Sequence, residues 1–218
     1  MKTEKKDHVQ RSLDHFKSIY RTLTPAEIAR RCALPFLRTE SAFELCIMGK
    51  TYLAKFPEFE LRDMDGRLAE RGYENILFLR YLCEGRYTEA TGKRLSYREI
   101  PWGEVYYQNF ERRCIKRLAD AFGNDLENFQ RIMETLRAEA LDKGDAGYRF
   151  EFIKGLYMDI LLWAGDDEFP PSAQILFNDN FVSAFTAEDI AVVGEVLIAR
   201  LKETQKGLFN PFSEYKLG

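Results

Sequence analysis

The chain has 218 residues, of which 45% are hydrophobic and 31% are charged, and its formal net charge is -3. A chain of this length buries about 70% of its extended surface on folding, so it needs neither disulfide bonds nor a structural metal to hold a core. Acidic and basic residues are intermixed along the chain, which argues against a nucleic-acid-binding surface.

The start of the chain has no pattern of a targeting segment. The charged N-terminal stretch is not followed by an apolar segment, which argues against a signal peptide. No run approaches the roughly 20 apolar residues of a transmembrane helix. We therefore expect a cytoplasmic protein without a membrane segment.

The N-terminal part begins with helical periodicity. Val9, Leu13, Phe16 and Tyr20 recur at spacings of three and four and predict an amphipathic helix that docks on the body of the protein. Thr24 and the proline after it are start signals for a second, short helix.

From residue 43 the period changes to two, which predicts a β-hairpin over residues 43–56 with its turn at Gly49 and Lys50. A third strand over 59–62 would extend the same antiparallel meander. Residues 76–82 are apolar nearly all round and predict a helix buried within the fold. Residues 88–103 have the pattern of a loop.

The C-terminal half predicts a pair of amphipathic helices over 107–122 and 129–136, followed by strands over 148–152, 156–164 and 175–177. The strand over 156–164 is the most apolar and is expected to be central. Thr186 and Asp189 form a capping box that opens a last helix. Four residues are expected to be largely buried in the core: Phe110, Leu161, Trp163 and Leu197.

These patterns together predict an α+β fold, a single domain with a mainly antiparallel sheet covered by amphipathic helices. We expect residues 1–40 to form an N-terminal helical segment, 41–205 the single α+β domain, and 206–218 a C-terminal tail. No repeat or low-complexity tract divides the chain.

An acidic segment follows the apolar strand over 156–164. Asp166, Asp167 and Glu168 are adjacent, with a glycine before them and two prolines shortly after. Carboxylates this close repel one another and titrate together, so they suit a cation, a basic ligand group or proton transfer. The alternative is a solvated turn whose acids face water.

A further carboxylate, Asp159, shares one face of the preceding strand with Tyr157 and Trp163. An unpaired buried charge is costly, so Asp159 is expected near the solvated start of the strand or in a salt bridge with Arg149 or Lys154. The full set of candidate binding residues is Asp145, Asp159, Trp163, Asp166, Asp167 and Glu168.

Four cysteines and two histidines are the other candidate metal ligands. The cysteines stand singly, without the Cys-x-x-Cys spacing of zinc or iron–sulfur sites, so we expect reduced, partly buried thiols and no metal site. These residues are Cys32, Cys46, Cys83 and Cys114. His8 and His15 form only a weak metal site, and their place near the N-terminus disfavours a histidine-dependent triad.

Phosphate chemistry has little support. A basic helix face could hold phosphate groups or an acidic partner, but such faces are more often solvated, and neighbouring acids offer local pairing. The face consists of Arg112, Arg113, Lys116 and Arg117. Residues 144–147 are too short for a glycine-rich phosphate loop and precede a strand rather than a helix.

Several segments resemble a family known only as a domain of unknown function, number thirty-seven eighty-six. The resemblance extends from about residue 43 to residue 201, and its most specific part runs from Trp163 to Pro170. The other matching segments are residues 42–49, 75–82, 144–147, 156–162 and 175–179. The chain departs from the family pattern at Lys154, where arginine and proline are more usual, and at Asn178, where aspartate is.

The resemblance implies a protein of anaerobic bacteria or archaea, and some members of the family are joined to iron–sulfur modules or encoded near corrinoid-dependent methyl-transfer proteins. The cysteine-rich module itself is absent from this chain. Two hypotheses follow: an accessory or binding protein for a cofactor-bearing partner, or a small enzyme that uses the acidic segment for acid–base or metal-assisted chemistry. The cofactor and the oligomeric state stay unknown.

Overall fold

The computed structural model describes residues 2–69 and 72–212, and the side chains from residue 9 onward within those ranges. It is an α+β fold in which the strand pairings are antiparallel, as the sequence predicts. Contacts group the described residues into two compact units. The first lies within residues 1–46, 51–88 and 183–185, and the second within 47–50, 89–182 and 186–218. The predicted single domain over 41–205 stays a prediction.

Among its described residues, the first unit contains α1 (Lys2–Thr22), α2 (Pro25–Cys32) and α3 (Gly72–Glu84), together with short strands. Thr24 caps α2 as predicted, because its side chain accepts a hydrogen bond from the backbone of Glu27. The Arg31 guanidinium donates to the carbonyls of Leu82 and Gly85 at 2.7 and 2.6 Å, which ties α2 to the end of α3.

The strands of this unit are β1 (Phe36–Leu37), β2 (Ala42–Ile47), β3 (Lys50–Lys55) and β4 (Leu61–Asp63). Aromatic rings fill the core beside them, with Tyr20 of α1 in edge contact with Phe56 and Phe59 at centroid distances of 5.2 and 5.9 Å. The predicted third strand is present as β4, but it covers Leu61–Asp63 and begins later than residue 59.

The predicted hairpin is confirmed, but its turn was placed one residue too late. Met48 and Gly49 form the two-residue turn, with φ of 47° and 80°, and Lys50 already belongs to β3. Two positive φ angles match the twist of the flanking strands. The hairpin tip belongs to the second unit, where Ile47 pairs with Ile153 of β7.

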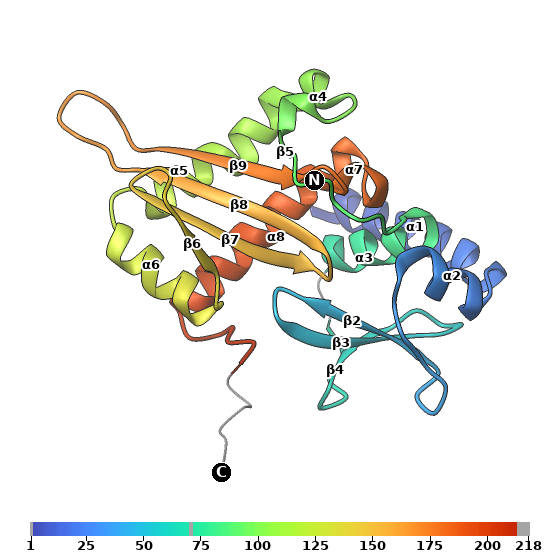
Figure 1. The fold of residues 1–218 in the computed structure, drawn as a ribbon. Coiled ribbons are helices and arrows are strands. Elements are labelled where there is room, and N and C mark those ends of the chain that lie inside the picture. The colour runs from blue at the N-terminus through green and yellow to red at the C-terminus, as the bar shows by residue number, and fades with distance from the viewer. Residues whose placement is uncertain (1, 70–71, 213–218) are drawn as a thin grey trace, which may run out of the picture. The chain divides into compact units, whose positions relative to one another are not determined.

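The second unit is built on β7 (Ala146–Ile153), β8 (Leu156–Trp163) and β9 (Ser172–Asn178), which lie side by side with β8 in the centre (Figure 1). A short strand, β6 (Glu139–Leu141), pairs with β7. On the other edge β5 (Arg94–Ser96) pairs with β9 and leads into a 3₁₀ turn, η1 (Tyr97–Glu99). Residues 88–103 were predicted to form a loop, but they include a strand and a 3₁₀ turn. Leu95 of the strand is buried beside Phe177.

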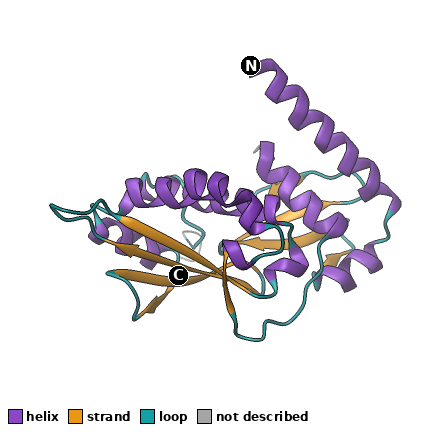
Figure 2. Cartoon of the chain, turned by 90° about the horizontal axis from the view of Figure 1, so that it is seen from above, coloured by secondary structure: helices purple, strands orange, loops and turns teal. Residues whose placement is uncertain are grey.

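Helices cover one face of this sheet (Figure 2). The helical elements of this part of the chain are α4 (Gly103–Phe110), a π-helical segment η2 (Glu111–Ile115), α5 (Lys116–Phe122), α6 (Leu126–Thr135), the short α7 (Phe181–Ala184), whose last two residues belong to the first unit, and α8 (Ala187–Gln205). The ring of Phe110 packs on that of Phe177 in β9 with a centroid distance of 6.2 Å. The ring of Phe129 packs on that of Tyr148 in β7 with a centroid distance of 5.8 Å. The capping box of Thr186 and Asp189 opens α8 as predicted.

Three of the four predicted core residues are buried: Phe110, Leu161 and Leu197. The prediction for Trp163 is wrong, because its side chain is only half-buried at the last residue of β8. Alternation assigned Trp163 to a face of the sheet correctly, but that face is not the one covered by the helices.

Candidate functional site

The uncovered face of β8 holds the most deeply buried carboxylate among the candidates. Asp159 is 0% exposed and lies opposite Arg149 of β7 in the strand register. Arg149 Nε donates to Asp159 Oδ1 at 2.8 Å and Nη2 donates to Oδ2 at 3.0 Å. Arg94 of β5 donates from Nε to Oδ2 at 3.0 Å. The predicted pairing with Arg149 is confirmed, and Lys154 is not the partner.

The two guanidinium groups extend this contact into a polar network that includes residues of five strands, β5 to β9. Arg94 also donates to Asn178 of β9, and Arg149 Nη1 lies 3.7 Å from Glu139 Oε2. The hydrogen bond to Asp159 is the main reason that the pKa of Arg149 is raised above its usual value. Both carboxylate oxygens of Asp159 therefore accept hydrogen bonds from arginines of neighbouring elements, and the carboxylate links their strands.

The acidic segment forms the loop from Gly165 to Pro171 between β8 and β9, and this loop extends beyond the ends of its strands (Figure 1). Asp166 organises it: Oδ1 accepts the backbone N–H groups of Glu168 and Phe169 at 2.8 and 2.7 Å. These two donors hold the pKa of Asp166 below its ordinary value.

The base of the same loop is closely packed. A side chain on Gly165 would approach the ring of Pro171 to 2.8 Å, and one on Gly123 at the end of α5 would approach it to 2.4 Å. Pro171 therefore closes the loop against two positions that have room only for glycine. The loop presents Asp167, Glu168 and Phe169 to solvent, and Phe169 is 67% exposed.

Asp145 lies at the same end of the sheet. Its Oδ2 accepts the backbone N–H of Ala164 at 2.8 Å, while its own backbone N–H donates to the carbonyl of Leu162 at 2.9 Å. Asp145, Trp163 and the loop base are thus brought together. Asp159 is separate from them, since four residues of strand place it about 13 Å from Trp163.

Several of the remaining candidate groups are paired or buried in the structure. Arg113 of the basic helix face makes two hydrogen bonds to Glu195 at 3.0 and 2.6 Å, and Arg117 lies 3.7 Å from the same carboxylate. Cys32, Cys83 and Cys114 are buried and Cys46 is half-buried, and burial raises the pKa of the Cys114 thiol to about 12. His15 is exposed, whereas the side chain of His8 lies outside the described residues.

Within the described ranges, no group of three or more His, Cys, Asp or Glu side chains is arranged to hold a metal ion. In the same ranges, no helix combines the length and apolar character needed to cross a membrane.

Sequence reasoning missed two cavities, because each is lined by residues far apart in the chain. The one in the second unit, of about 270 Å³, lies beside Arg149 and Tyr157 and is bordered by Gly49 and Arg137. Phe212 also lines it, stacked on the Arg137 guanidinium at 4.1 Å. The cavity in the first unit is larger, about 700 Å³. No local motif signals either of them.

The fold and the site define a class: an α+β protein whose antiparallel sheet carries a rigid, exposed acidic loop. The model of one family, Domain of unknown function (DUF3786), matches residues 24–200. The chain belongs to this family. No curated protein and no solved structure shows significant similarity to it.

Proposed function

We propose that the chain is an accessory or binding protein that docks through the 165–171 loop onto a cofactor-bearing partner. The observation that supports the proposal is that one acidic residue of the loop fixes the backbone while the next three residues are exposed. The Asp166 carboxylate accepts hydrogen bonds from two backbone N–H groups and so fixes the loop backbone. The side chains of Asp167, Glu168 and Phe169 are exposed to solvent. Such a preformed loop loses little conformational entropy on binding.

The chemistry of the exposed residues indicates the kind of partner. Two adjacent carboxylates suit a basic patch of Lys or Arg side chains, and an exposed phenylalanine suits an apolar pocket inside that patch. The anaerobic, corrinoid- or iron–sulfur-linked setting of the partner rests on the resemblance of the sequence to its family, whose description assigns no activity.

The same geometry favours binding over acid–base catalysis at this site. A catalytic carboxylate must face a substrate in a site that excludes water. Asp159 instead faces two arginines, and Asp167 and Glu168 face solvent. These positions support a recognition role for the acidic residues.

The test begins with a photo-reactive phenylalanine analogue at position 169 of the full chain, exposed to an extract of the source organism. The cross-linked protein is then purified with its cofactor, and its affinity for the chain is measured by titration. The triple variant Asp167→Asn, Glu168→Gln, Phe169→Ala should weaken binding by at least about 10-fold, since hot-spot contacts are worth a kcal/mol or more. Glu127→Gln, on the exposed first turn of α6, is the matched charge control.

Two results would overturn the proposal. One is a purified partner that binds the triple variant as tightly as the unmodified chain. The other is cross-linking at position 169 that yields no partner containing a cofactor. Thermal unfolding of the triple variant should stay close to that of the parent, because the three side chains are exposed.

A further inference from the structure

The exposed side of the helical run formed by α4, η2 and α5 is apolar where the run begins. Trp102, Val105 and Tyr106 are 77%, 71% and 43% exposed, and their spacing of three and four places them side by side. The side of a surface helix that faces away from the core normally carries polar residues, and contiguous exposed apolar residues indicate an interaction surface. We call these three residues the apolar end of the helix.

The backbone of Trp102 indicates that the indole is not required by the fold. Its φ of 66° lies in the left-handed region, which a large side chain rarely adopts. The turn depends on the neighbouring residues: the N–H of Gly103 donates to the carbonyl of Ile100 at 2.7 Å, and a Cβ on Gly103 would lie 1.8 Å from the carbonyl oxygen of Tyr97. Asparagine adopts this backbone at lower cost. Stability alone therefore does not explain a tryptophan here, whereas a contact made by the indole does.

The same side of the helical run becomes basic further along. Asn109, Arg112 and Lys116 continue the line of exposed residues from Val105 at spacings of four, three and four. Arg112 Nη2 donates to Asn109 Oδ1 over 3.4 Å, and neither Arg112 nor Lys116 forms an ion pair with a described residue. We call Arg112 and Lys116 the basic end of the helix.

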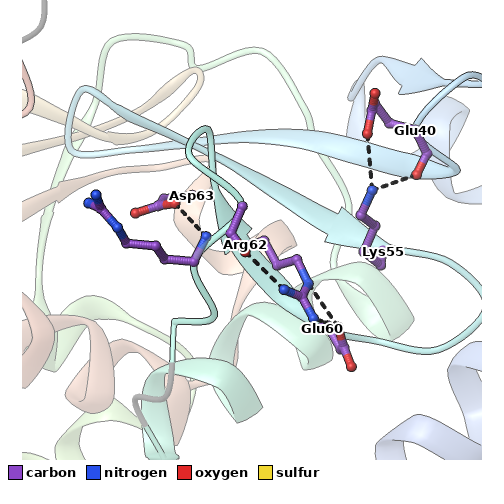
Figure 3. A network of polar contacts seen from close by, with 7 residues as sticks. Glu40, Lys55, Glu60, Arg62 and Asp63 are labelled. Carbon is purple, nitrogen blue, oxygen red and sulfur yellow. Dashed lines mark hydrogen bonds and ion pairs between the residues drawn. The ribbon is translucent and has the colours of Figure 1, made fainter.

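Exposed cations of the first unit show the contrast. Figure 3 shows Lys55 paired with Glu40 and Arg62 paired with Glu60, at 3.1 and 2.6 Å. Such pairs satisfy the cations within the chain. Among the described residues, no acid holds the basic end in this way, so its cations are available to a group outside the chain.

We propose that this side of the helix is the interface between two copies of the chain, packed antiparallel about a two-fold axis at Asn109. Positions equally far from 109 then face each other, so Trp102 of one copy lies over Lys116 of the second copy, and Tyr106 lies over Arg112. The symmetry makes each contact twice. Aromatic faces attract cations, and closed two-fold dimers are the commonest assemblies of identical chains. The apolar end of each copy is therefore complementary to the basic end of the other.

The other charges beside the helix agree with this arrangement. Acids outnumber cations around the apolar end, so the net charge there attracts the basic end of a second copy; the charged residues are Lys93, Arg98, Glu99, Glu104 and Glu188. Two further arginines of the helix are held by Glu195 of the same chain. Asp120 lies one turn beyond Lys116, toward the η1 segment of the second copy, where Arg98 is 54% exposed. Glu111 is half-buried beside the line of exposed residues.

This interface does not involve the 165–171 loop. Pro171 packs on Gly123, at the opposite end of the helical run from Trp102, so both loops stay exposed in the dimer. The inference goes beyond the proposed docking function and does not depend on it.

Sedimentation velocity of the full chain over a series of concentrations should show a reversible equilibrium between monomer and dimer. Trp102→Asn removes the indole and leaves a residue that adopts the left-handed backbone readily, so it should raise the dimer dissociation constant at least about 10-fold without loss of stability. The double variant Arg112→Glu, Lys116→Glu should raise the constant by a similar factor. Arg131→Glu on α6 and Phe169→Ala in the loop are the controls for charge and for an exposed apolar residue, and neither should change it.

Asn109→Cys tests the position of the axis. Two cysteines that face each other across the axis of an antiparallel helix pair come within reach of a disulfide bond. The oxidised Asn109→Cys chain should therefore run as a covalent dimer, whereas Gln130→Cys, on an exposed residue of α6, and the parent chain should not. Thermal unfolding of each variant confirms that it is folded.

The proposal is overturned if the parent chain sediments as a monomer at every concentration, if Trp102→Asn dimerises as tightly as the parent, or if Phe169→Ala abolishes the dimer. A dimer in which Asn109→Cys fails to cross-link would also overturn it, because the axis would then lie elsewhere.

Discussion

Arg149 holds the carboxylate of Asp159 at two points, with Nε 2.8 Å from Oδ1 and Nη2 3.0 Å from Oδ2. Because Arg94 approaches the same carboxylate from the other side, one buried anion joins β5, β7 and β8. The arrangement places a fully buried charge on the sheet face that the helices do not cover, where its partners keep 19% and 28% of their side-chain surface exposed.

We predict that Asp159→Asn lowers the free energy of unfolding by about 3 kcal/mol, because removal of one member of a buried ion pair leaves its partners without compensation. Chemical denaturation measures this change. Glu139→Gln is the control, since Glu139 is 66% exposed and 3.7 Å from Arg149, and exposed pairs contribute less than about 1 kcal/mol. Equal losses in the two variants would contradict the prediction.

A second prediction concerns the pH dependence of the 165–171 loop. The backbone N–H groups of Phe169 and Glu168 lower the pKa of Asp166, so the ionised form stabilises the folded state. This contribution is fully present above the unfolded pKa of about 3.9 and is lost as the pH falls through the lower folded pKa. The stability difference between the parent chain and Asp166→Ala should therefore shrink on acidification below about pH 4. A difference that is constant from neutral to acid pH would contradict it.

A third prediction compares two large aromatic residues. Phe110 is 1% exposed and stacks on Tyr97 at 3.9 Å, so Phe110→Ala should cost about 3–5 kcal/mol. Trp163 is half-buried, and Trp163→Ala should cost only about 1–2 kcal/mol despite the larger ring. Denaturation midpoints of the two variants give the order, and a larger loss for Trp163 would contradict the prediction.

A fourth prediction concerns the close approach of α8 to the π-helical segment. A Cβ on Gly194 would lie 2.7 Å from Cys114 Sγ, so Gly194→Ala should destabilise the protein by about 1–3 kcal/mol, although alanine is the better helix former. Cys114→Ala removes the obstructing sulfur. The double variant should recover part of the loss, and simple additivity of the two single variants would argue against a direct clash.

Local patterns in the sequence were sufficient for most elements. The stripe of Val9 to Tyr20, the cap at Thr24 and the box of Thr186 and Asp189 all depend on neighbours within four residues, and all are confirmed. The antiparallel character followed from the separate groups of period-two segments. These patterns could not predict β5. Its three residues are too few to show a period, and they pair with a strand some 80 residues further along the chain.

The candidate site was predicted only in part, because one of its contacts joins residues that lie far apart in the sequence. Arg149 was named, with Lys154 as the alternative, as a partner for Asp159, whereas Arg94 is 65 residues away in a segment interpreted as a loop. The hairpin turn was misplaced because methionine rarely adopts a positive φ, yet Met48 does so. The roles in binding that were predicted for Asp145, Asp159, Trp163, Asp166, Asp167 and Glu168 stay predictions.

The π-helical segment Glu111–Ile115 has a consequence for how the chain can change through evolution. A π turn holds one residue more than the α-helical turn around it, and one residue corresponds to about 100° of rotation about the helix axis. A relative that lacks this one extra residue could continue as a regular α-helix with Leu118 and Phe122 still facing the core, whereas loss of a residue from the α-helical turns after it would rotate both away from the core. Among homologues, loss of a single residue should therefore be found within residues 111–115 and excluded from the α-helical turns of residues 116–122.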